Sequence, residues 1–237
     1  MISREDFCSR VDFARLTHNH SRQDMLHACR QAVRYGFAAL CVNPCEVALC
    51  KEQVKGTGVS VGTVIGYPLG VNTTRTKIFE AMDAVENGAD ELDVVLNVSR
   101  FNDGDDDYVL NELQQVVGIA KAMNPKVLVK VIIERYYIKD EDLPRVCELV
   151  IASGADFVKQ ASGYAPADIP NGELDIKRIR EIVGDRIRIK AAFGCGETLR
   201  EFCDAIEYGA DRVGTPIADI KLEETPDNFW MPEEESK

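Results

Sequence analysis

One short pattern, Gly-Ala-Asp, constrains the fold of this chain more than any other feature of its sequence. It occurs at 88–90, 154–156 and 209–211, and Tyr35-Gly36-Phe37 resembles a degenerate fourth copy. Each copy follows an amphipathic stretch and precedes a short apolar run rich in β-branched residues. Glycine ends helices readily because it adopts the left-handed conformation. Repetition of helix, glycine and buried strand predicts βα units around a parallel sheet.

Apolar runs and helical stretches alternate along the chain. The runs are nearly continuous, which is typical of strands buried on both faces. We expect strands at 11–14, 38–42, 59–65, 91–97, 127–133, 157–160, 187–191 and 212–214. We expect helices at 22–35, 46–55, 74–86, 108–123, 140–152, 174–183 and 198–208. This order predicts an α/β fold, a (β/α)8 TIM barrel. The alternative is a doubly wound open sheet, but the Gly-x-Gly-x-x-Gly turn usual in that fold is absent.

Length and charge narrow the domain organisation and the partners. The chain has 237 residues and a net charge of −12, from 28 basic and 40 acidic residues. We expect one barrel domain over 1–222 and an acidic C-terminal tail over 223–237. An acidic protein without a basic stripe is a poor partner for nucleic acid or an anionic membrane. No apolar run reaches the roughly 18 residues of a membrane-spanning helix, and the first residues lack the apolar segment of a signal peptide.

The cysteines and histidines indicate a reducing compartment and no metal site. Most of the eight cysteines lie in apolar or helical contexts, which is typical of free thiols in a cytoplasmic protein. Cys41, Cys45 and Cys50 lack paired C-x-x-C spacing, and His18 and His20 are more typical of a solvated turn than of a metal site. We therefore expect no metal and no organic cofactor.

Charged residues interrupt several of the apolar runs, and these residues are the catalytic candidates. They are Asp93, Lys130, Lys159 and Lys190. Burial of an unpaired ammonium is costly, so a single buried lysine would be paired or would reach the rim of the barrel. Two lysines on late strands suggest more, because neighbouring ammonium groups lower the pKa of one of them. A neutral amine is the nucleophile of Schiff-base chemistry, and an aspartate can relay protons.

The same segments resemble the deoxyribose-phosphate aldolase family of class I aldolases from about residue 11 to residue 215. The similar segments are 41–44, 63–70 with 72–74, 80–81, 87–97, 130–134 and 154–159. The resemblance implies a TIM barrel and a reversible aldol addition of acetaldehyde to glyceraldehyde 3-phosphate. It places Lys159 at the Schiff-base lysine, Lys190 at the second lysine that lowers its pKa, and Asp93 at the proton relay. It also matches Asp12 to a first-strand aspartate of the family.

The chain departs from this family where the phosphate of the substrate is held. The family's Thr-Ser-Thr-Gly reads Gln-Ala-Ser-Gly at 160–163, and the first glycine of a Gly-Gly pair is Phe193. The family's Gly-Thr-Ser-Ser-Gly reads Gly-Thr-Pro-Ile-Ala at 214–218, which removes an N–H donor and a hydroxyl. Asp219 adds negative charge, and Ala14 replaces a threonine. The remaining candidates for substrate binding are Asp12, Gly163, Gly194 and Gly214.

These observations predict a lysine Schiff-base aldolase acting on a small aldehyde or sugar-phosphate substrate, with an acceptor that differs from the usual one or a phosphate that is held differently. A catalytically silent barrel with a scaffold or regulatory role is the first alternative. A metal-dependent aldolase or isomerase is the second, and it would require histidines and carboxylates at the strand ends. We expect a homodimer as one possible assembly and a cytoplasmic location.

Overall fold

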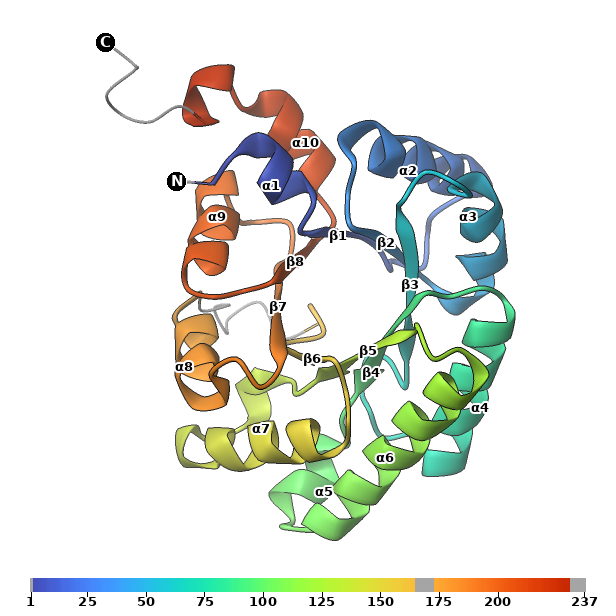
Figure 1. Cartoon of the computed structure of the whole chain (residues 1–237), viewed down its shortest axis with the longest axis vertical. Coiled ribbons are helices and arrows are strands. Elements are labelled where there is room, and N and C mark those ends of the chain that lie inside the picture. Colours follow the sequence, from blue (N-terminus) through green and yellow to red (C-terminus); the bar gives the residue numbers. More distant parts are fainter. Residues whose placement is uncertain (1, 165–172, 231–237) are drawn as a thin grey trace.

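The computed structural model describes residues 2–164 and 173–230, and its described strands form one closed parallel barrel (Figure 1). Neighbouring strands pair in chain order, and β8 pairs with β1 to close the ring. The strands are β1 (Val11–Arg15), β2 (Ala39–Val42), β3 (Ser60–Ile65), β4 (Glu91–Val95), β5 (Leu128–Ile132), β6 (Phe157–Lys159), β7 (Arg188–Ala192) and β8 (Arg212–Thr215). The prediction of a TIM barrel is confirmed.

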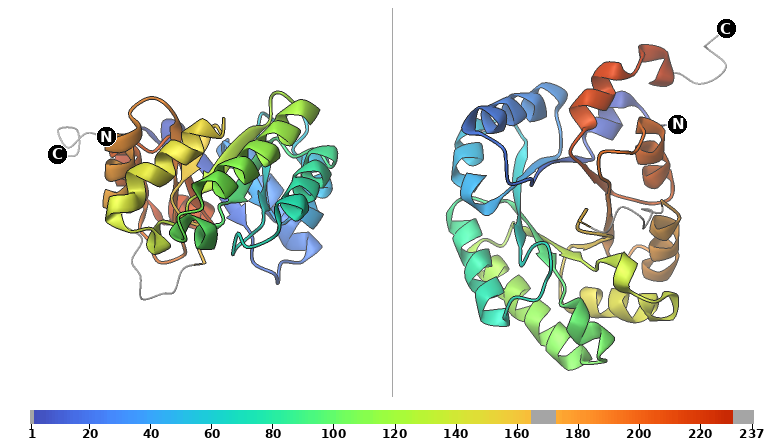
Figure 2. Two further views of the ribbon diagram at one scale, coloured as in Figure 1. Left: turned by 90° about the horizontal axis from the view of Figure 1, so that it is seen from below. Right: turned by 180° about the vertical axis from the view of Figure 1, so that it is seen from behind.

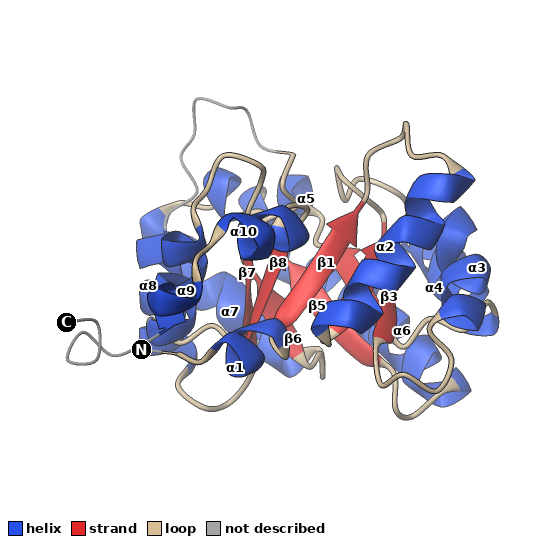
Figure 3. Cartoon of the chain, turned by 90° about the horizontal axis from the view of Figure 1, so that it is seen from above, coloured by secondary structure: helices blue, strands red, loops and turns tan. Residues whose placement is uncertain are grey.

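Helices surround the barrel on its outside, as the turned views show (Figures 2 and 3). The helices that connect successive strands are α2 (Arg22–Tyr35), α3 (Val47–Gln53), α4 (Thr74–Glu86), α6 (Asp106–Met123), α7 (Leu143–Ala152), α8 (Glu173–Val183) and α9 (Leu199–Glu207). Three further helices were not predicted from the sequence: α1 (Arg4–Cys8), α5 (Val98–Asn102) and α10 (Ala218–Glu224). Each has five to seven residues, which is too short to show a clear helical period.

The Gly-Ala-Asp repeat performs one structural task three times. Its glycines follow α4, α7 and α9 with φ angles of 98°, 79° and 109°, which lie in the left-handed region favoured by glycine. Its aspartates directly precede the next strand, and each accepts a hydrogen bond from a backbone N–H of the strand before it. These bonds join Asp90 to Val61, Asp156 to Val129 and Asp211 to Ile189.

A basic side chain from a neighbouring helix completes each copy of the repeat. Lys51 pairs with Asp90, Lys121 with Asp156 and Arg180 with Asp211. All three pairs lie where strands begin, at the end of a TIM barrel that is associated with stability. The repeat is therefore part of the framework and not of the chemistry.

Alternation along the strands separates an apolar shell from a charged interior. In β4, Leu92 and Val94 face outward into the hydrophobic cluster beneath the helices, whereas Glu91 and Asp93 face inward. The same period of two holds in β7, where Ile189 packs outward and the next residue, Lys190, faces inward. The period therefore places the charged residues that interrupted the apolar runs at the centre of the barrel.

The C-terminal residues that the structure describes pack on the body of the protein. The predicted boundary between 222 and 223 falls inside α10. Glu223 accepts hydrogen bonds from Arg34 and Tyr35, and the ring of Trp230 lies 5.7 Å from that of Phe7. Residues 231–237 of the predicted tail lie outside the described part. Within the described residues, no helix has the length and apolarity needed to cross a membrane.

Candidate active site

Two lysine amines share one carboxylate oxygen at the centre of the barrel. The Nζ atom of Lys159 lies 2.7 Å from Oδ2 of Asp93, and the Nζ atom of Lys190 lies 2.8 Å from the same oxygen. The three side chains come from β6, β7 and β4, and each is at most 4% exposed. The structure thus brings together the three residues that the sequence singled out for catalysis.

The surroundings of the two lysines shift their pKa values in opposite directions. Burial lowers the pKa of Lys159, and although Asp93 opposes this effect, the nearby ammonium of Lys190 adds to it. Burial acts in the same sense on Lys190, but the carboxylates of Asp12 and Asp93 outweigh it and raise the pKa of Lys190 well above its ordinary value. Lys190 is therefore held as a cation, and Lys159 loses its proton more easily than an ordinary lysine.

The inward carboxylates remain ionised because lysines surround them. Burial by itself would raise the pKa of Asp93, but Lys159, Lys190 and Lys130 hold it well below the ordinary range. The pKa of Asp12 is lowered in the same way by Lys130, Lys190 and an arginine. Both carboxylates therefore act as fixed negative charges near neutral pH.

Lys130 is the fourth catalytic candidate from the sequence, and it contacts a different set of partners. Its Nζ atom lies 2.5 Å from Asp12 and also contacts Glu91, whereas its distance to Asp93 is 3.8 Å. Lys130 therefore belongs to an ion cluster that lies nearer the start of the strands, and we assign it no direct role in bond formation.

A cavity of about 450 Å³ lies at the carboxyl ends of the strands. Its lining residues come mainly from the segments after β1, β6, β7 and β8. They include Gly163 and Gly194, two of the predicted substrate-binding residues. Asp12 and Gly214, the other two, do not line it: Asp12 is fully buried among cations, and Gly214 lies against Lys190. A Cβ atom at Gly214 would lie 2.9 Å from Cε of Lys190, so this glycine leaves room for the lysine.

Tyr67 is a lining residue of the cavity that also interacts electrostatically with Asp93. It lines the cavity, donates a hydrogen bond of 2.8 Å to the carbonyl of Ser162 and packs edge-on against Tyr164. Burial raises the pKa of its phenol, with smaller contributions from Cys41 and Asp93. The sequence placed Tyr67 in a segment of family resemblance but assigned it no role, because only the fold brings its ring into the lining of this cavity.

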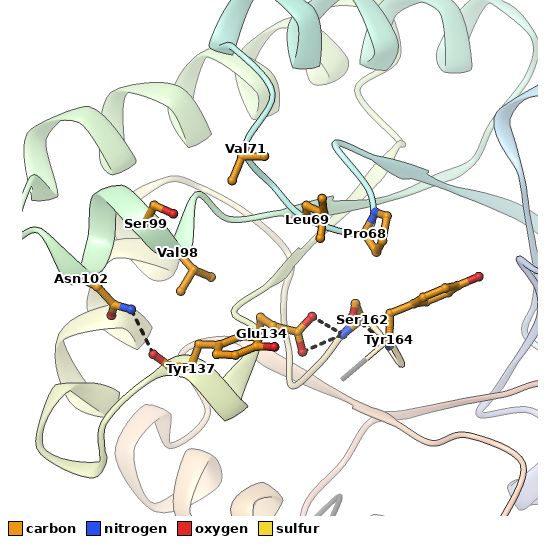
Figure 4. A pocket seen from close by; sticks show the side chains of 10 residues that line it. All are labelled: Pro68, Leu69, Val71, Val98, Ser99, Asn102, Glu134, Tyr137, Ser162 and Tyr164. Atoms are coloured by element: carbon orange, nitrogen blue, oxygen red, sulfur yellow. Dashed lines mark hydrogen bonds between the residues drawn. The ribbon is translucent and has the colours of Figure 1, made fainter. Parts of the chain in front are cut away.

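A second cavity of about 370 Å³ shares the lining residues Ser162 and Tyr164 with the first. Figure 4 shows the side chains that line this second cavity. Glu134 lines this second cavity and accepts hydrogen bonds from the backbone N–H of Ser162. Burial raises the pKa of Glu134. Its φ angle of 48° is unusual for a residue other than glycine, and such strain is concentrated at functional sites. No feature of the sequence predicted this conformation.

The region of the predicted phosphate site holds an internally paired cation. Arg15, at the end of β1, donates to the carbonyl of Pro216 and lies 3.3 Å from Asp219. Pro216 and Ile217 themselves line the larger cavity. The charge of Arg15 is thus already balanced by a carboxylate of this chain.

The histidines do not join this centre. His20 lines the larger cavity and contacts the hydroxyl of Thr17, but no hydrogen bond or ion pair joins it to Asp93, Lys159 or Lys190 within the described residues. No group of three or more His, Cys, Asp or Glu side chains suited to a metal ion occurs within residues 2–164 and 173–230.

Comparison with known proteins identifies the family. The model of the DeoC/LacD family of aldolases matches residues 8–215. The chain belongs to this family. Its relatives include the deoxyribose-phosphate aldolase of Thermoanaerobacter pseudethanolicus, with 42% identity over 214 residues, which cover 90% of this chain and 94% of the relative. The deoxyribose-phosphate aldolase of Thermococcus kodakarensis is 38% identical over 228 residues, which cover 95% of this chain and all of the relative.

Solved structures agree with this DeoC/LacD assignment. The tetrameric deoxyribose-phosphate aldolase of Aeropyrum pernix superposes with a TM-score of 0.84 at 28% identity, covering 96% of this chain and 92% of that one. Another solved aldolase has a TM-score of 0.82 at 34% identity and covers 93% of this chain and 94% of its own. The protein is therefore a TIM-barrel aldolase, and the predicted fold and reaction class are confirmed.

Proposed function

We propose that this DeoC/LacD aldolase works through a Schiff base on Lys159 and adds acetaldehyde reversibly to an aldehyde acceptor. The observation that carries the proposal is the pair of lysine amines on one oxygen of Asp93, at 2.7 and 2.8 Å. One carboxylate stabilises one ammonium in a buried site, so the second amine is free to act as a nucleophile. No metal or organic cofactor is part of this mechanism.

The amine of Lys159 would attack the carbonyl carbon of the donor and form a carbinolamine. Lys190 would supply the proton that allows the hydroxyl to leave as water, which yields an iminium ion. Asp93 would take the proton from the neighbouring carbon, directly or through a water molecule, and so generate the enamine. The enamine would then attack the acceptor aldehyde, and hydrolysis of the product iminium would release Lys159.

A trapping experiment tests this mechanism. The protein is incubated with acetaldehyde and borohydride, and peptide mass spectrometry locates the reduced adduct. We expect an ethyl group on Lys159 in the wild-type protein and none in the Lys159→Leu variant. An active wild-type protein without an adduct on Lys159 would disprove the Schiff-base mechanism.

The residues that line the cavity bear on the chemistry of the acceptor aldehyde. The curated relatives are named for deoxyribose phosphate, and the corresponding reaction here would join acetaldehyde to glyceraldehyde 3-phosphate. In this chain, however, Pro216 and Ile217 line the cavity, and Arg15 is paired with Asp219. An anionic phosphate would have to compete with a carboxylate for this arginine. We therefore propose an acceptor without a phosphate group at this position.

Parallel kinetics with two acceptors test the substrate proposal. Glyceraldehyde and glyceraldehyde 3-phosphate are compared through kcat/KM, with the deoxyribose-phosphate aldolase of Thermoanaerobacter pseudethanolicus as the reference. A charge-assisted contact to the phosphate is worth roughly 1.5–3 kcal/mol, or about 10- to 150-fold in kcat/KM, so without that contact we expect the two values to agree within about tenfold. A preference for the phosphorylated acceptor of about a thousandfold would contradict it. Gly163 and Gly194 would then be the residues to examine as phosphate donors.

The silent-scaffold alternative does not account for the interior of the barrel. Burial of charged groups without a catalytic purpose is at best neutral for stability compared with an apolar core. Lys159 and Lys190 are nevertheless almost completely buried there, and both contact the one carboxylate of Asp93.

Location and assembly complete the proposal. All eight cysteines are free thiols, which supports a cytoplasmic location. A homodimer remains our proposal for the assembly, and light scattering of the purified protein tests it.

A further inference from the structure

Seven charged side chains fill the barrel interior, and they form one connected chain of ion pairs. All but one are at most 4% exposed, and the exception, Arg212, is 16% exposed. They are Asp12, Glu91, Asp93, Lys130, Lys159, Lys190 and Arg212. Among these seven residues, four can carry positive charge and three can carry negative charge.

In the part of this ion-pair network nearest the start of the strands, positive and negative charges are equal in number. Arg212 and Glu91 are the first residues of β8 and β4, and their side chains lie 3.0 Å apart. Arg212 also contacts Asp12, and Lys130 bridges Asp12 and Glu91. Two cations therefore meet two carboxylates, and the guanidinium of Arg212 is charged at every relevant pH.

The part of the ion-pair network nearer the cavity contains two amines and one carboxylate. Lys159 and Lys190 both contact that carboxylate, which belongs to Asp93. Lys190 also reaches Asp12 at 2.6 Å, but two other cations already contact Asp12. A buried site tolerates little net charge, so the surplus proton leaves the amine with fewer carboxylate contacts, which is Lys159.

We infer that Arg212 and Glu91 are positioning residues of the aldol reaction: their balance around Asp12 leaves Asp93 to be shared by two amines, and this sharing keeps Lys159 unprotonated. The inference rests on the proposed Schiff-base role of Lys159. It adds two residues that are remote from the cavity and that no motif of the sequence indicated.

The other titratable groups that face Lys159 would be the same in the wild-type protein and in variants of Arg212 and Glu91. Besides Asp93 and Lys190, the side chains of Cys41 on β2 and Glu134 after β5 interact with it electrostatically. Burial raises the pKa of Cys41 to about 11, so that thiol is neutral at the relevant pH. Burial also raises the pKa of Glu134. Neither residue contacts Arg212 or Glu91 in a hydrogen bond or ion pair recorded for the described residues.

The experiment measures kcat/KM for the aldol reaction between about pH 5 and about pH 9, where the acid limb reports protonation of the free enzyme. Arg212→Met removes a cation, so Asp12 would bind Lys190 more strongly and Asp93 would hold Lys159 as an ammonium. We expect the acid limb to move to higher pH by about one unit or more, which is about a tenfold loss of rate below the limb. Glu91→Gln removes a carboxylate, and we expect the limb to move to lower pH.

The double variant is the matched control because it removes one charge of each sign. We expect Arg212→Met with Glu91→Gln to return the limb to within about half a unit of wild type, even where the plateau rate is lower. Arg212→Lys, which keeps the charge, should likewise leave the limb in place. A purely structural role would lower the plateau in all four variants without opposite displacements of the limb.

Failure of this inference can be told apart from failure of the proposed function. Wild-type protein that forms no borohydride adduct on Lys159 refutes the proposed mechanism. Wild-type protein that forms the adduct, together with a limb that stays fixed or moves in one direction in both single variants, overturns the role of Arg212 and Glu91 alone. If Arg212→Met does not fold, Glu91→Gln decides the question, and an unmoved limb in that variant overturns the inference.

Discussion

A single methyl group at Gly214 should impair catalysis far more than it impairs folding. The φ angle of Gly214 lies outside the left-handed region, so alanine is compatible with its backbone. The added Cβ would, however, lie 2.9 Å from Cε of Lys190, whereas ordinary contact begins at 3.4 Å. The end of the lysine must therefore move by about 0.5 Å, the difference between these two distances.

The fold can absorb this movement, but the ion pairs of Lys190 cannot. The end of a lysine is flexible, so we expect the free energy of unfolding to fall by no more than about 1–3 kcal/mol. The Nζ atom is held between Asp12 at 2.6 Å and Asp93 at 2.8 Å, and a shift of that size lengthens at least one of these contacts. Misplacement of a catalytic group by about 1 Å can cost about 100-fold in rate. We expect kcat to fall by about 10- to 100-fold.

The assay measures kcat, KM and thermal unfolding for Gly214→Ala. Because Gly214 does not line the acceptor cavity, KM for the acceptor should change by less than about threefold. Gly118→Ala on α6 is the control, since its Cβ would meet nothing within 4 Å and alanine there should slightly stabilise the helix. The reasoning is refuted if Gly214→Ala folds and keeps kcat within twofold of wild type. A rise in KM at unchanged kcat would instead return Gly214 to the substrate-binding role predicted from the sequence.

Three further predictions concern the charges and the metal independence of the enzyme. Lys190→Leu should lower kcat/KM at neutral pH by about 10²- to 10⁴-fold, because a proton donor and the repulsion on Lys159 are both lost; steady-state kinetics measure this, and a near-normal rate contradicts the role of Lys190. Lys77→Met, measured by urea unfolding, should cost about 3–5 kcal/mol because the buried carboxylate of Glu112 loses the ammonium that lies 2.5 Å from it. Lys77→Met combined with Glu112→Leu should recover most of this loss. Treatment with EDTA should leave the aldol rate unchanged, and loss of activity restored by a divalent metal would favour a metal-dependent mechanism instead.

The sequence predicted the secondary structure closely because the barrel imposes strict local rules. The expected strands agree with the observed ones to within two residues at each end, since each strand is an apolar run bounded by polar residues. The helix ends predicted from the Gly-Ala-Asp repeat were correct for a similar reason, because glycine is strongly favoured where a helix ends in the left-handed conformation. The short helices α1, α5 and α10 were missed because five to seven residues carry too little periodic signal.

The candidate site was predicted less evenly. Lys159, Lys190 and Asp93 were recognised because a charge inside an apolar run demands an explanation. Arg212 and Glu91 were not, since polar residues at the first position of a strand are ordinary. Their part in the ion chain depends on how β4, β5, β8 and β1 face one another across the barrel.

The sequence by itself therefore determined the βα repeat, the closed parallel sheet and the identity of the three central residues, because these follow from local spacing and from the cost of burying charge. Only the tertiary structure decided which cation pairs with each carboxylate. Asp12 became a partner of three cations, and Gly214 became the space that Lys190 occupies. The physical reason is that electrostatic energy inside a barrel depends on distances between strands that are far apart in the chain, and those distances exist only once the ring has closed.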